Sequence, residues 1–216
     1  MYQPAHFEEK SCLRIAELVA TAPLATLVVT SPEGLVANHI PFVLHGDDLT
    51  SATLQAHIPR ANPLAELLAT APSCLVIFHG PDGYISPSYY ATKPKHGRVV
   101  PTWNYAVVHV HGHASLVEDA AWLRNQMEQL TQLQERHRDE PWEISDAPAD
   151  YTDRLMGALV GVEVMIERVE AKTKASQNQP LENQHSVLRH MDREQANSAL
   201  TQLMHAVLEP HSPKAE

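Results

Sequence analysis

The chain contains few of the residues that mark common covalent and phosphate-binding motifs. Its 216 residues include only two cysteines, Cys12 and Cys74, which make neither a disulfide framework nor a Cys-x-x-Cys metal site. The eight glycines form no dinucleotide-binding fingerprint and no Walker loop. No nucleophile has a catalytic base beside it in the sequence. These absences argue against classical nucleotide-binding and hydrolase motifs.

Long apolar runs are also missing. No run approaches the roughly 18 residues that a membrane-spanning helix needs, so we expect no membrane association. The opening segment MYQPAHFEEK has no basic region followed by an apolar stretch, and we therefore expect no secretory signal. Apolar residues make up 44% of the chain, which is enough to form a core. The composition predicts a cytoplasmic globular protein.

Positive charge is scarce and unevenly placed. The 16 Lys and Arg stand against 26 Asp and Glu, so the chain as a whole repels nucleic acid and anionic membranes. Residues 118–153 hold ten of the acids, whereas residues 83–117 hold none. The segments 34–46, 49–65 and 171–181 also lack acids. The cations in these four acid-free windows are Arg60, Lys93, Lys95, Arg98, Lys172 and Lys174.

If the acid-free windows converge in the fold, they would form a locally positive cavity suited to a phosphate. The alternative is that strands and barrel interiors carry few acids simply because they pack a core. Buried segments seldom hold this many unpaired Lys and Arg, which favours an anionic ligand.

Hydrophobic periodicity predicts strands and helices in alternation. Strands are expected at 24–30, 35–44, 49–57, 74–79, 99–117 and 159–170, and helices at 8–21, 63–71, 118–138 and 149–158, with one or two further helices over 181–208. About six strands with helices at the rim indicate an α+β fold, and a small antiparallel barrel would remove the open edges of the sheet. We expect a barrel domain over 1–180 and a C-terminal helical extension over 181–216, packed on the barrel or on a partner subunit.

Three polar segments are candidates for ligand contacts. In HIPRANP, Arg60 is a bidentate donor, Asn62 adds an amide, and Pro63 can open a helix whose N–H groups would face the same anion. An ordinary strand-to-helix corner would look the same. In VVPTWNY, Trp103 and a tyrosine could wall a flat aromatic ligand while Asn104 bonds its edge, or they could belong to an aromatic core. The third segment, KTKASQN at 172–178, offers cations, a hydroxyl and amides, which could form a third wall for a phosphate or a heteroaromatic edge or could simply be a solvated strand exit.

The segment HVHGH places His109, His111 and His113 on one face of a strand, as in a metal or haem site. No cysteine or carboxylate lies near them in the sequence, and three histidines on one strand converge poorly on a tetrahedral ion. We therefore predict no metal site. Binding of haem by these histidines stays open as an alternative.

Six segments carry a resemblance to a known family, and they span nearly the whole chain. They are MYQPAHF, ATLVVTSPEGLVANHIPF, HIPRANP, VIFHGPDGYISPSYYATK, VVPTWNYAVVHVHG and LVGVEVMIERVEAKTKASQN. In this order they resemble the FMN-binding negative transcriptional regulators, the PaiB-like proteins, whose fold is similar to the FMN-binding split barrels.

The resemblance implies an antiparallel split barrel that forms a homodimer with FMN in clefts at the subunit interface. It assigns Arg60 and Asn62 to the flavin phosphate and points His39 toward the flavin ring. The pocket walls that it implies are Lys93, Trp103, Asn104, Lys174, Ser176 and Gln177.

The resemblance further implies a flavin-binding transcriptional repressor. A DNA-reading helix should be basic, yet residues 181–209 carry two Arg and four acids, which predicts weak DNA binding or regulation through a DNA-binding partner. Two alternatives stay open. One is a flavin reductase or another FMN-dependent oxidoreductase that uses NAD(P)H. The other is a haem-binding split barrel that uses the histidine cluster.

Overall fold

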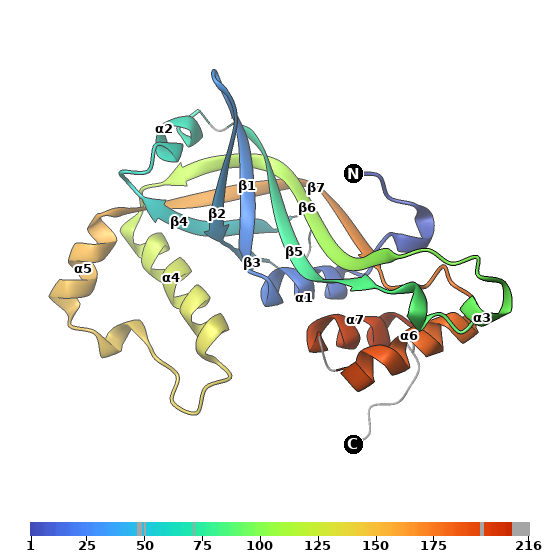
Figure 1. Ribbon diagram of the computed structural model, residues 1–216. Coiled ribbons are helices and arrows are strands. Elements are labelled where there is room, and N and C mark those ends of the chain that lie inside the picture. Colours follow the sequence, from blue (N-terminus) through green and yellow to red (C-terminus); the bar gives the residue numbers. More distant parts are fainter. Residues whose placement is uncertain (47–48, 50, 71, 195–196, 209–216) are drawn as a thin grey trace. The chain divides into compact units, whose positions relative to one another are not determined.

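The computed structural model shows an α+β protein and describes residues 1–46, 49, 51–70, 72–194 and 197–208 (Figure 1). The chain divides into two compact units. Unit 1 comprises Met1–Lys10, His79–Val107 and Ala171–Glu216, and unit 2 comprises Ser11–Phe78 and Val108–Glu170. Three long strands each contribute residues to both units.

The strands are β1 (Leu24–Ser31), β2 (Gly34–Pro41), β3 (Val43–His45), β4 (Thr53–Pro59), β5 (Ser73–Ile85), β6 (Thr102–Val117) and β7 (Leu159–Lys174). The α-helices are α1 (Cys12–Thr21), α2 (Leu64–Leu68), α3 (Lys93–His96), α4 (Ala120–Glu135), α5 (Ala149–Gly157), α6 (Leu181–Glu194) and α7 (Ser198–Leu208). Short 3-10 turns cover η1 (Ala5–Phe7), η2 (Pro87–Tyr89) and η3 (Ile144–Asp146).

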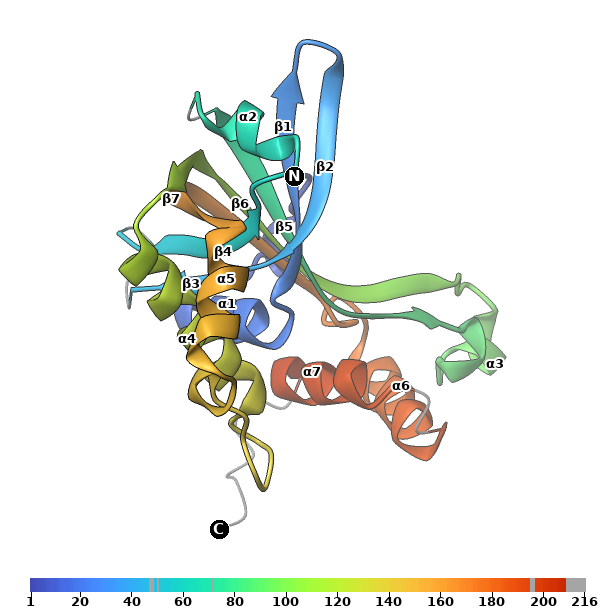
Figure 2. The ribbon, with the colours of Figure 1, turned by 90° about the vertical axis from the view of Figure 1, so that its left-hand side faces the viewer.

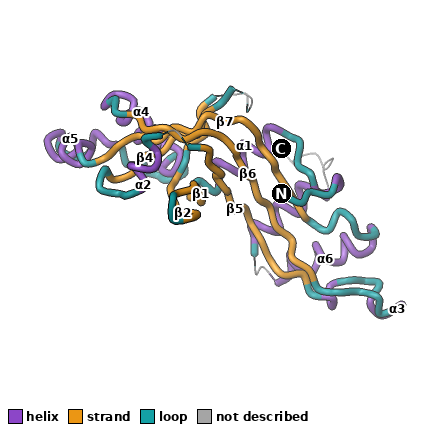
Figure 3. Tube along the Cα trace, turned by 90° about the horizontal axis from the view of Figure 1, so that it is seen from above, coloured by secondary structure: helices purple, strands orange, loops and turns teal. Residues whose placement is uncertain are grey.

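The strands form one sheet with the order β2-β1-β5-β6-β7-β4-β3. Figure 3 shows β5, β6 and β7 lying beside one another, as this order requires. The sheet has β2 at one end and β3 at the other, yet only Phe42 separates these strands in the sequence. The sheet must therefore curl until its two ends meet, which produces a barrel and confirms the predicted architecture.

Unit 2 contains the barrel interior. Strand β1 alternates buried and partly exposed residues and forms an antiparallel hairpin with β2 (Figure 2). In the register of this hairpin Leu27 lies opposite Asn38. Phe42 and Phe78 are buried and pack edge to face with ring centroids 6.3 Å apart. The other fully buried side chains of this core include Leu27, Leu54, Ile58, Val76, Val108, Val162 and Val164. Period-2 alternation places these side chains on the inner face of the barrel.

Unit 1 has a separate core beneath the C-terminal helices. Its buried cluster consists of Ile85, Tyr90, Ala175, Val187, Leu188, Met191, Leu200 and Met204. A Cβ atom at Gly83 would lie 2.7 Å from Cδ2 of Leu200, so a larger residue there would require the Leu200 side chain to shift where α7 packs on β5. The predicted helical stretch 181–208 is two helices, and α7 begins after Asn197, whose Oδ1 accepts the Leu200 N–H at 3.1 Å.

The structure confirms the predicted strands and adds two features. The described residues contain seven strands rather than about six, because the predicted strand 35–44 is divided at Phe42 into β2 and β3. Strand β5 continues to Ile85 through Gly80-Pro81-Asp82-Gly83, a sequence typical of a turn. Pro81 is tolerated because it lies beyond Cys74–Ile77, the part of β5 that pairs with β1, so that pairing needs no N–H group from it.

The predicted domain boundary at residue 180 stays a prediction, and residues 209–216 of the predicted extension lie outside the described part of the chain. None of the described helices combines the length and the apolar character that crossing a bilayer requires.

Candidate functional site

The corner between β4 and α2 positions Arg60 and Asn62. The backbone N–H of Arg60 donates to the Ala158 carbonyl at 2.9 Å, which ties the corner to the start of β7. The Arg60 guanidinium is exposed, and its Nη1 lies 2.6 Å from Oε2 of Glu118. The Asn62 side chain accepts the Leu64 N–H at 3.0 Å and donates to Oδ1 of Asn38 at 3.4 Å. The structure thus places an arginine and a primary amide two residues apart at one corner of unit 2.

The N–H groups at the start of α2 already have acceptors within the chain. Asn62 N–H donates to the Pro59 carbonyl at 2.9 Å, and Ala65 N–H donates to the Asn62 carbonyl at 2.9 Å. Leu64 N–H donates to the Asn62 side chain. The expectation that these groups face an anion is therefore wrong for this conformation, because the tight corner uses them. The side chains of Arg60 and Asn62 remain as possible hydrogen-bond donors to an anion.

His39 lies on β2, opposite Thr26 of β1. Its ring is exposed, and Nδ1 is 3.1 Å from the Thr26 hydroxyl. Asn38, next to it in the strand, points to the opposite face because side chains alternate. His39 and Asn38 therefore lie on opposite faces of the hairpin, and it is Asn38 that contacts Asn62.

In unit 1 the structure brings Asn104 and Ser176 together. The Asn104 side chain is fully buried, and its Nδ2 donates to the Ser176 hydroxyl at 2.8 Å and contacts Met204 Sδ at 3.5 Å. Asn104 Oδ1 has no hydrogen-bond partner among the described residues, an arrangement that costs about 1–3 kcal/mol. Ser176 has a φ of 66°, an uncommon backbone conformation for a residue with a side chain.

Lys174 and Gln177 flank this pair along the chain. Lys174 is half-buried, and its ammonium donates to the Thr102 hydroxyl. Burial is the main cause that lowers the pKa of Lys174; Tyr105 opposes the shift and Lys172 adds to it. The Gln177 amide folds back on its own backbone, accepting the Ala175 N–H at 2.6 Å and donating to the Thr173 carbonyl at 2.6 Å.

Trp103 is 53% exposed, and its partner Tyr84 is 52% exposed. Their rings meet edge to face with centroids 6.4 Å apart. These two aromatics therefore form an exposed pair on β5 and β6 rather than part of a core. Lys93 begins α3 and is exposed.

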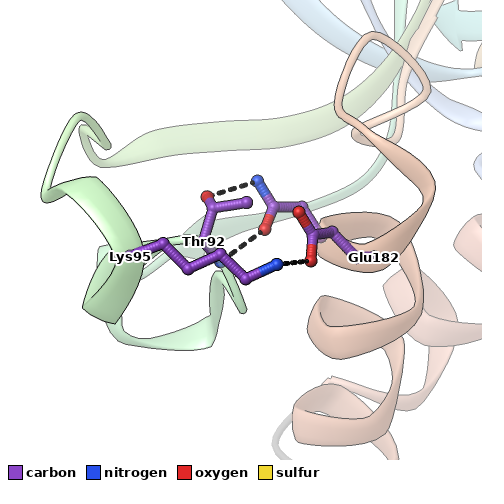
Figure 4. Close-up of polar contacts among 4 residues, drawn as sticks. Thr92, Lys95 and Glu182 are labelled. Carbon is purple, nitrogen blue, oxygen red and sulfur yellow. Dashed lines mark hydrogen bonds and ion pairs between the residues drawn. The ribbon is translucent and has the colours of Figure 1, made fainter.

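Acids from other parts of the chain lie beside two cations of the acid-free windows. Arg60 pairs with Glu118, and Lys95 pairs with Glu182 of α6 (Figure 4). Lys172 instead lies over aromatic rings, with its Nζ 5.3 Å from the centroid of Tyr105 and 5.7 Å from that of Tyr2. The sequence does not show these ion pairs, because their acids come from segments outside the windows.

The three histidines of β6 do not act as one set. His113 contacts Glu167 at 3.1 Å and the Ser73 hydroxyl at 3.1 Å. His109 and His111 have ring centroids 6.5 Å apart, and His111 Nε2 is 3.0 Å from Oε2 of Glu170. Glu170 lies on the neighbouring strand β7, 59 residues further on, so the sequence pattern alone could not reveal this carboxylate.

The curled antiparallel sheet gives this chain a split-barrel fold. Residues 1–168 match the family FMN_bind_2, described as "Putative FMN-binding domain", and the chain belongs to this family. The family match supports FMN as the cofactor.

Three known proteins illustrate the similarity. The chain is 32% identical over 222 residues to an uncharacterised protein of Aspergillus fumigatus, covering 82% of this chain and 85% of the relative. It is 29% identical over 199 residues to the protease synthase and sporulation protein PAI 2 of Bacillus subtilis, covering 92% and 93%. The solved FAD- and haem-binding protein from Mycobacterium smegmatis superposes with a TM-score of 0.60 at 20% identity, covering 77% and 73%.

Proposed function

We propose that the protein binds FMN with its phosphate on Arg60 and Asn62. The observation that carries this proposal is the Arg60–Glu118 ion pair, in which the two side chains are 46% and 64% exposed. A surface ion pair of this kind contributes only about 0–1 kcal/mol, so a phosphate can displace Glu118 at little cost. Two oxygens of the phosphate would then accept both arms of the guanidinium.

Asn62 suits the second contact. Its Nδ2 now makes a long hydrogen bond of 3.4 Å to Asn38, and a charged phosphate oxygen is a stronger acceptor than that amide. Its Oδ1 continues to hold the Leu64 N–H, which keeps the side chain in place. Bound FMN supplies redox chemistry at its isoalloxazine ring, while these residues bind and orient the molecule. The roles of His39 and of the six residues assigned as pocket walls stay predictions.

A comparison of FMN with riboflavin, which lacks the phosphate, tests this assignment. Quenching of flavin fluorescence gives both affinities. Arg60→Ala should weaken FMN binding by about 1.5–3 kcal/mol, the range for a hydrogen bond to a charged group, and leave riboflavin binding unchanged. Equal losses for both ligands would place the phosphate elsewhere.

Glu118→Gln is the matched variant. It removes the acid that competes for Arg60 and should strengthen FMN binding without altering riboflavin binding. Unchanged or weaker FMN binding in this variant would count against the displacement of Glu118 by the phosphate.

We further propose that the FMN-bound protein is a homodimer that acts as a negative transcriptional regulator. The likeness of the sequence to PaiB-like regulators and the long match to PAI 2 support this role. Light scattering with and without FMN tests the dimer. A monomer under both conditions would exclude an interface that FMN stabilises.

The charges of α6 favour weak direct contact with DNA. The exposed Arg189 and Arg193 alternate with the exposed acids Asp192 and Glu194, so this helix presents no basic face. Gel-shift titrations on promoter DNA at low salt should give weak binding, and nanomolar binding would contradict this expectation.

Two other functions remain to be tested. Bleaching of bound flavin by NADH or NADPH would favour a flavin reductase, and the absence of any reduction would argue against it. The structural neighbour from Mycobacterium smegmatis is by name a FAD- and haem-binding protein, and His109 and His111 stand close together here. A Soret band with haemin that is lost in His109→Ala would favour haem binding.

A further inference from the structure

Two histidines and one glutamate of unit 2 lie together across β6 and β7. His109 and His111 share a face of β6 because side chains repeat every second residue. Glu170 comes from β7, which neighbours β6 in the sheet. One ligand atom from each of the three side chains can be chosen so that all lie within 4.8 Å of one another.

The strands approach closely at this point. A Cβ atom at Gly112 would lie only 2.0 Å from the carbonyl oxygen of Met165, so only glycine allows β6 to pass this close to β7. Gly112 follows His111 directly in the strand. The backbone next to His111 therefore lies in close contact with β7, the strand that carries Glu170.

The distance between His111 and Glu170 suits a shared metal ion. Their Nε2 and Oε2 atoms are 3.0 Å apart. Two ligands that each lie about 2.1 Å from a zinc ion are separated by about 3.0–3.4 Å when they subtend 90–109° at the metal. An ion can enter between them with little movement of either side chain. Rotation of the His109 side chain would bring one of its ring nitrogens to the same ion as a third ligand.

The ligand types point to a particular class of ion. Imidazole nitrogens suit Zn²⁺, Ni²⁺ and Cu²⁺, whereas Mg²⁺ and Ca²⁺ prefer oxygen ligands throughout. Two histidines with one carboxylate leave coordination positions for water or a substrate. We infer that His109, His111 and Glu170 form a site for a divalent transition-metal ion of the zinc class, independent of the proposed FMN contacts.

Arg168 competes for the same carboxylate. Its Nη1 lies 2.8 Å from the Oε2 atom of Glu170 that also contacts His111. A metal ion that uses this oxygen must displace the guanidinium. Removing Arg168 should therefore tighten metal binding, a result that surface histidines binding metal without a built site would not produce.

Titration of the purified, chelator-treated protein with Co²⁺ alone tests the site, because the visible spectrum of Co²⁺ reports its ligands and coordination number. The wild type should bind one high-affinity equivalent. His111→Ala and Glu170→Gln should each weaken binding at least about tenfold, since even outer-shell partners of metal ligands contribute 10–100-fold. Arg168→Met should strengthen binding.

His113→Ala is the matched control, since His113 lies on the same strand and contacts Glu167 and Ser73 instead. It should leave Co²⁺ affinity unchanged, and the FMN affinity of every variant reports whether it folds. Equal weakening by His113→Ala, no effect of Glu170→Gln, or no high-affinity equivalent in the wild type would each overturn the proposal. Binding of haemin without binding of Co²⁺ would also overturn it.

Discussion

Asn183 of α6 holds Thr92 by two hydrogen bonds. Its Oδ1 accepts the Thr92 N–H at 3.1 Å, and its Nδ2 donates to the Thr92 hydroxyl at 3.0 Å (Figure 4). Both residues are buried, with exposed fractions of 2% and 6%. The side chain thus completes the hydrogen bonding of a loop residue 91 positions away and fastens α6 to the segment before α3.

Asn183→Ala should lower the free energy of unfolding by about 2–4 kcal/mol, because it removes two buried hydrogen bonds and leaves the Thr92 N–H without its acceptor. Urea denaturation measures the change. The control is Glu182→Ala, which breaks only the exposed ion pair with Lys95 and should cost about 0–1 kcal/mol. Equal effects of the two variants would contradict the importance of the buried pair.

Gly112→Ala should destabilise the barrel strongly. The new methyl group would meet the Met165 backbone carbonyl at 2.0 Å, and a backbone atom cannot move aside without separating β6 from β7. Overpacking costs typically about 1–3 kcal/mol, and the clash here is with backbone. Thermal unfolding should show a lowered midpoint. Gly157→Ala has nothing within 4 Å of its Cβ and should leave the midpoint unchanged or raise it.

Asn104→Ala separates a structural role from a ligand contact. Because the side chain is fully buried beneath Met204 and bonded to Ser176, we expect a loss of about 1–3 kcal/mol in the free energy of unfolding. FMN affinity measured on the same variant tests the pocket-wall role that the family resemblance implies, and a value within about twofold of wild type, a free-energy change under 0.5 kcal/mol, would argue against that role. A large loss of FMN affinity with unchanged stability would instead support the contact that the family resemblance implied.

Only one of the two cysteines should react in the native protein. Cys12 is exposed, whereas burial, and to a lesser degree the charge of Glu167, raises the pKa of Cys74 to about 12. Because the thiolate is the reactive form, Ellman's reagent at pH 8 should titrate one thiol rapidly and the second only after unfolding. Rapid reaction of two thiols would contradict the burial of Cys74.

The raised pKa of Cys74 also predicts a pH dependence of stability. In the unfolded chain this thiol loses its proton near its ordinary pKa of about 8.5, while the folded protein retains the proton up to about 12. Stability should therefore fall as pH rises through this window, by up to about 1.4 kcal/mol per pH unit. Comparison of the wild type with Cys74→Ala isolates this contribution, and identical slopes would refute it.

The order of strands and helices was readable from the sequence because hydrophobic alternation and turn residues are local properties. The strand at 159–170 and the helices near 120–135 and 149–157 follow from their own residues. The segment from Gly80 to Gly83 could not be predicted as strand, because its extended form depends on pairing with β6 and on packing against Leu200. The local sequence favours a turn there, but the tertiary contacts stabilise the extended conformation.

The sequence by itself determined the composition, the α+β periodicity and the residue types at the candidate phosphate corner. Only the tertiary structure decided which polar side chains meet, because Glu118 pairs with Arg60 and Glu170 contacts His111 across 58 and 59 residues of chain. It also decided that Asn104 is buried while Trp103 is exposed, although the two are neighbours in one strand. Electrostatic and packing energies depend on distance in space, and a barrel that joins its two edges at Phe42 brings together segments that the sequence keeps apart.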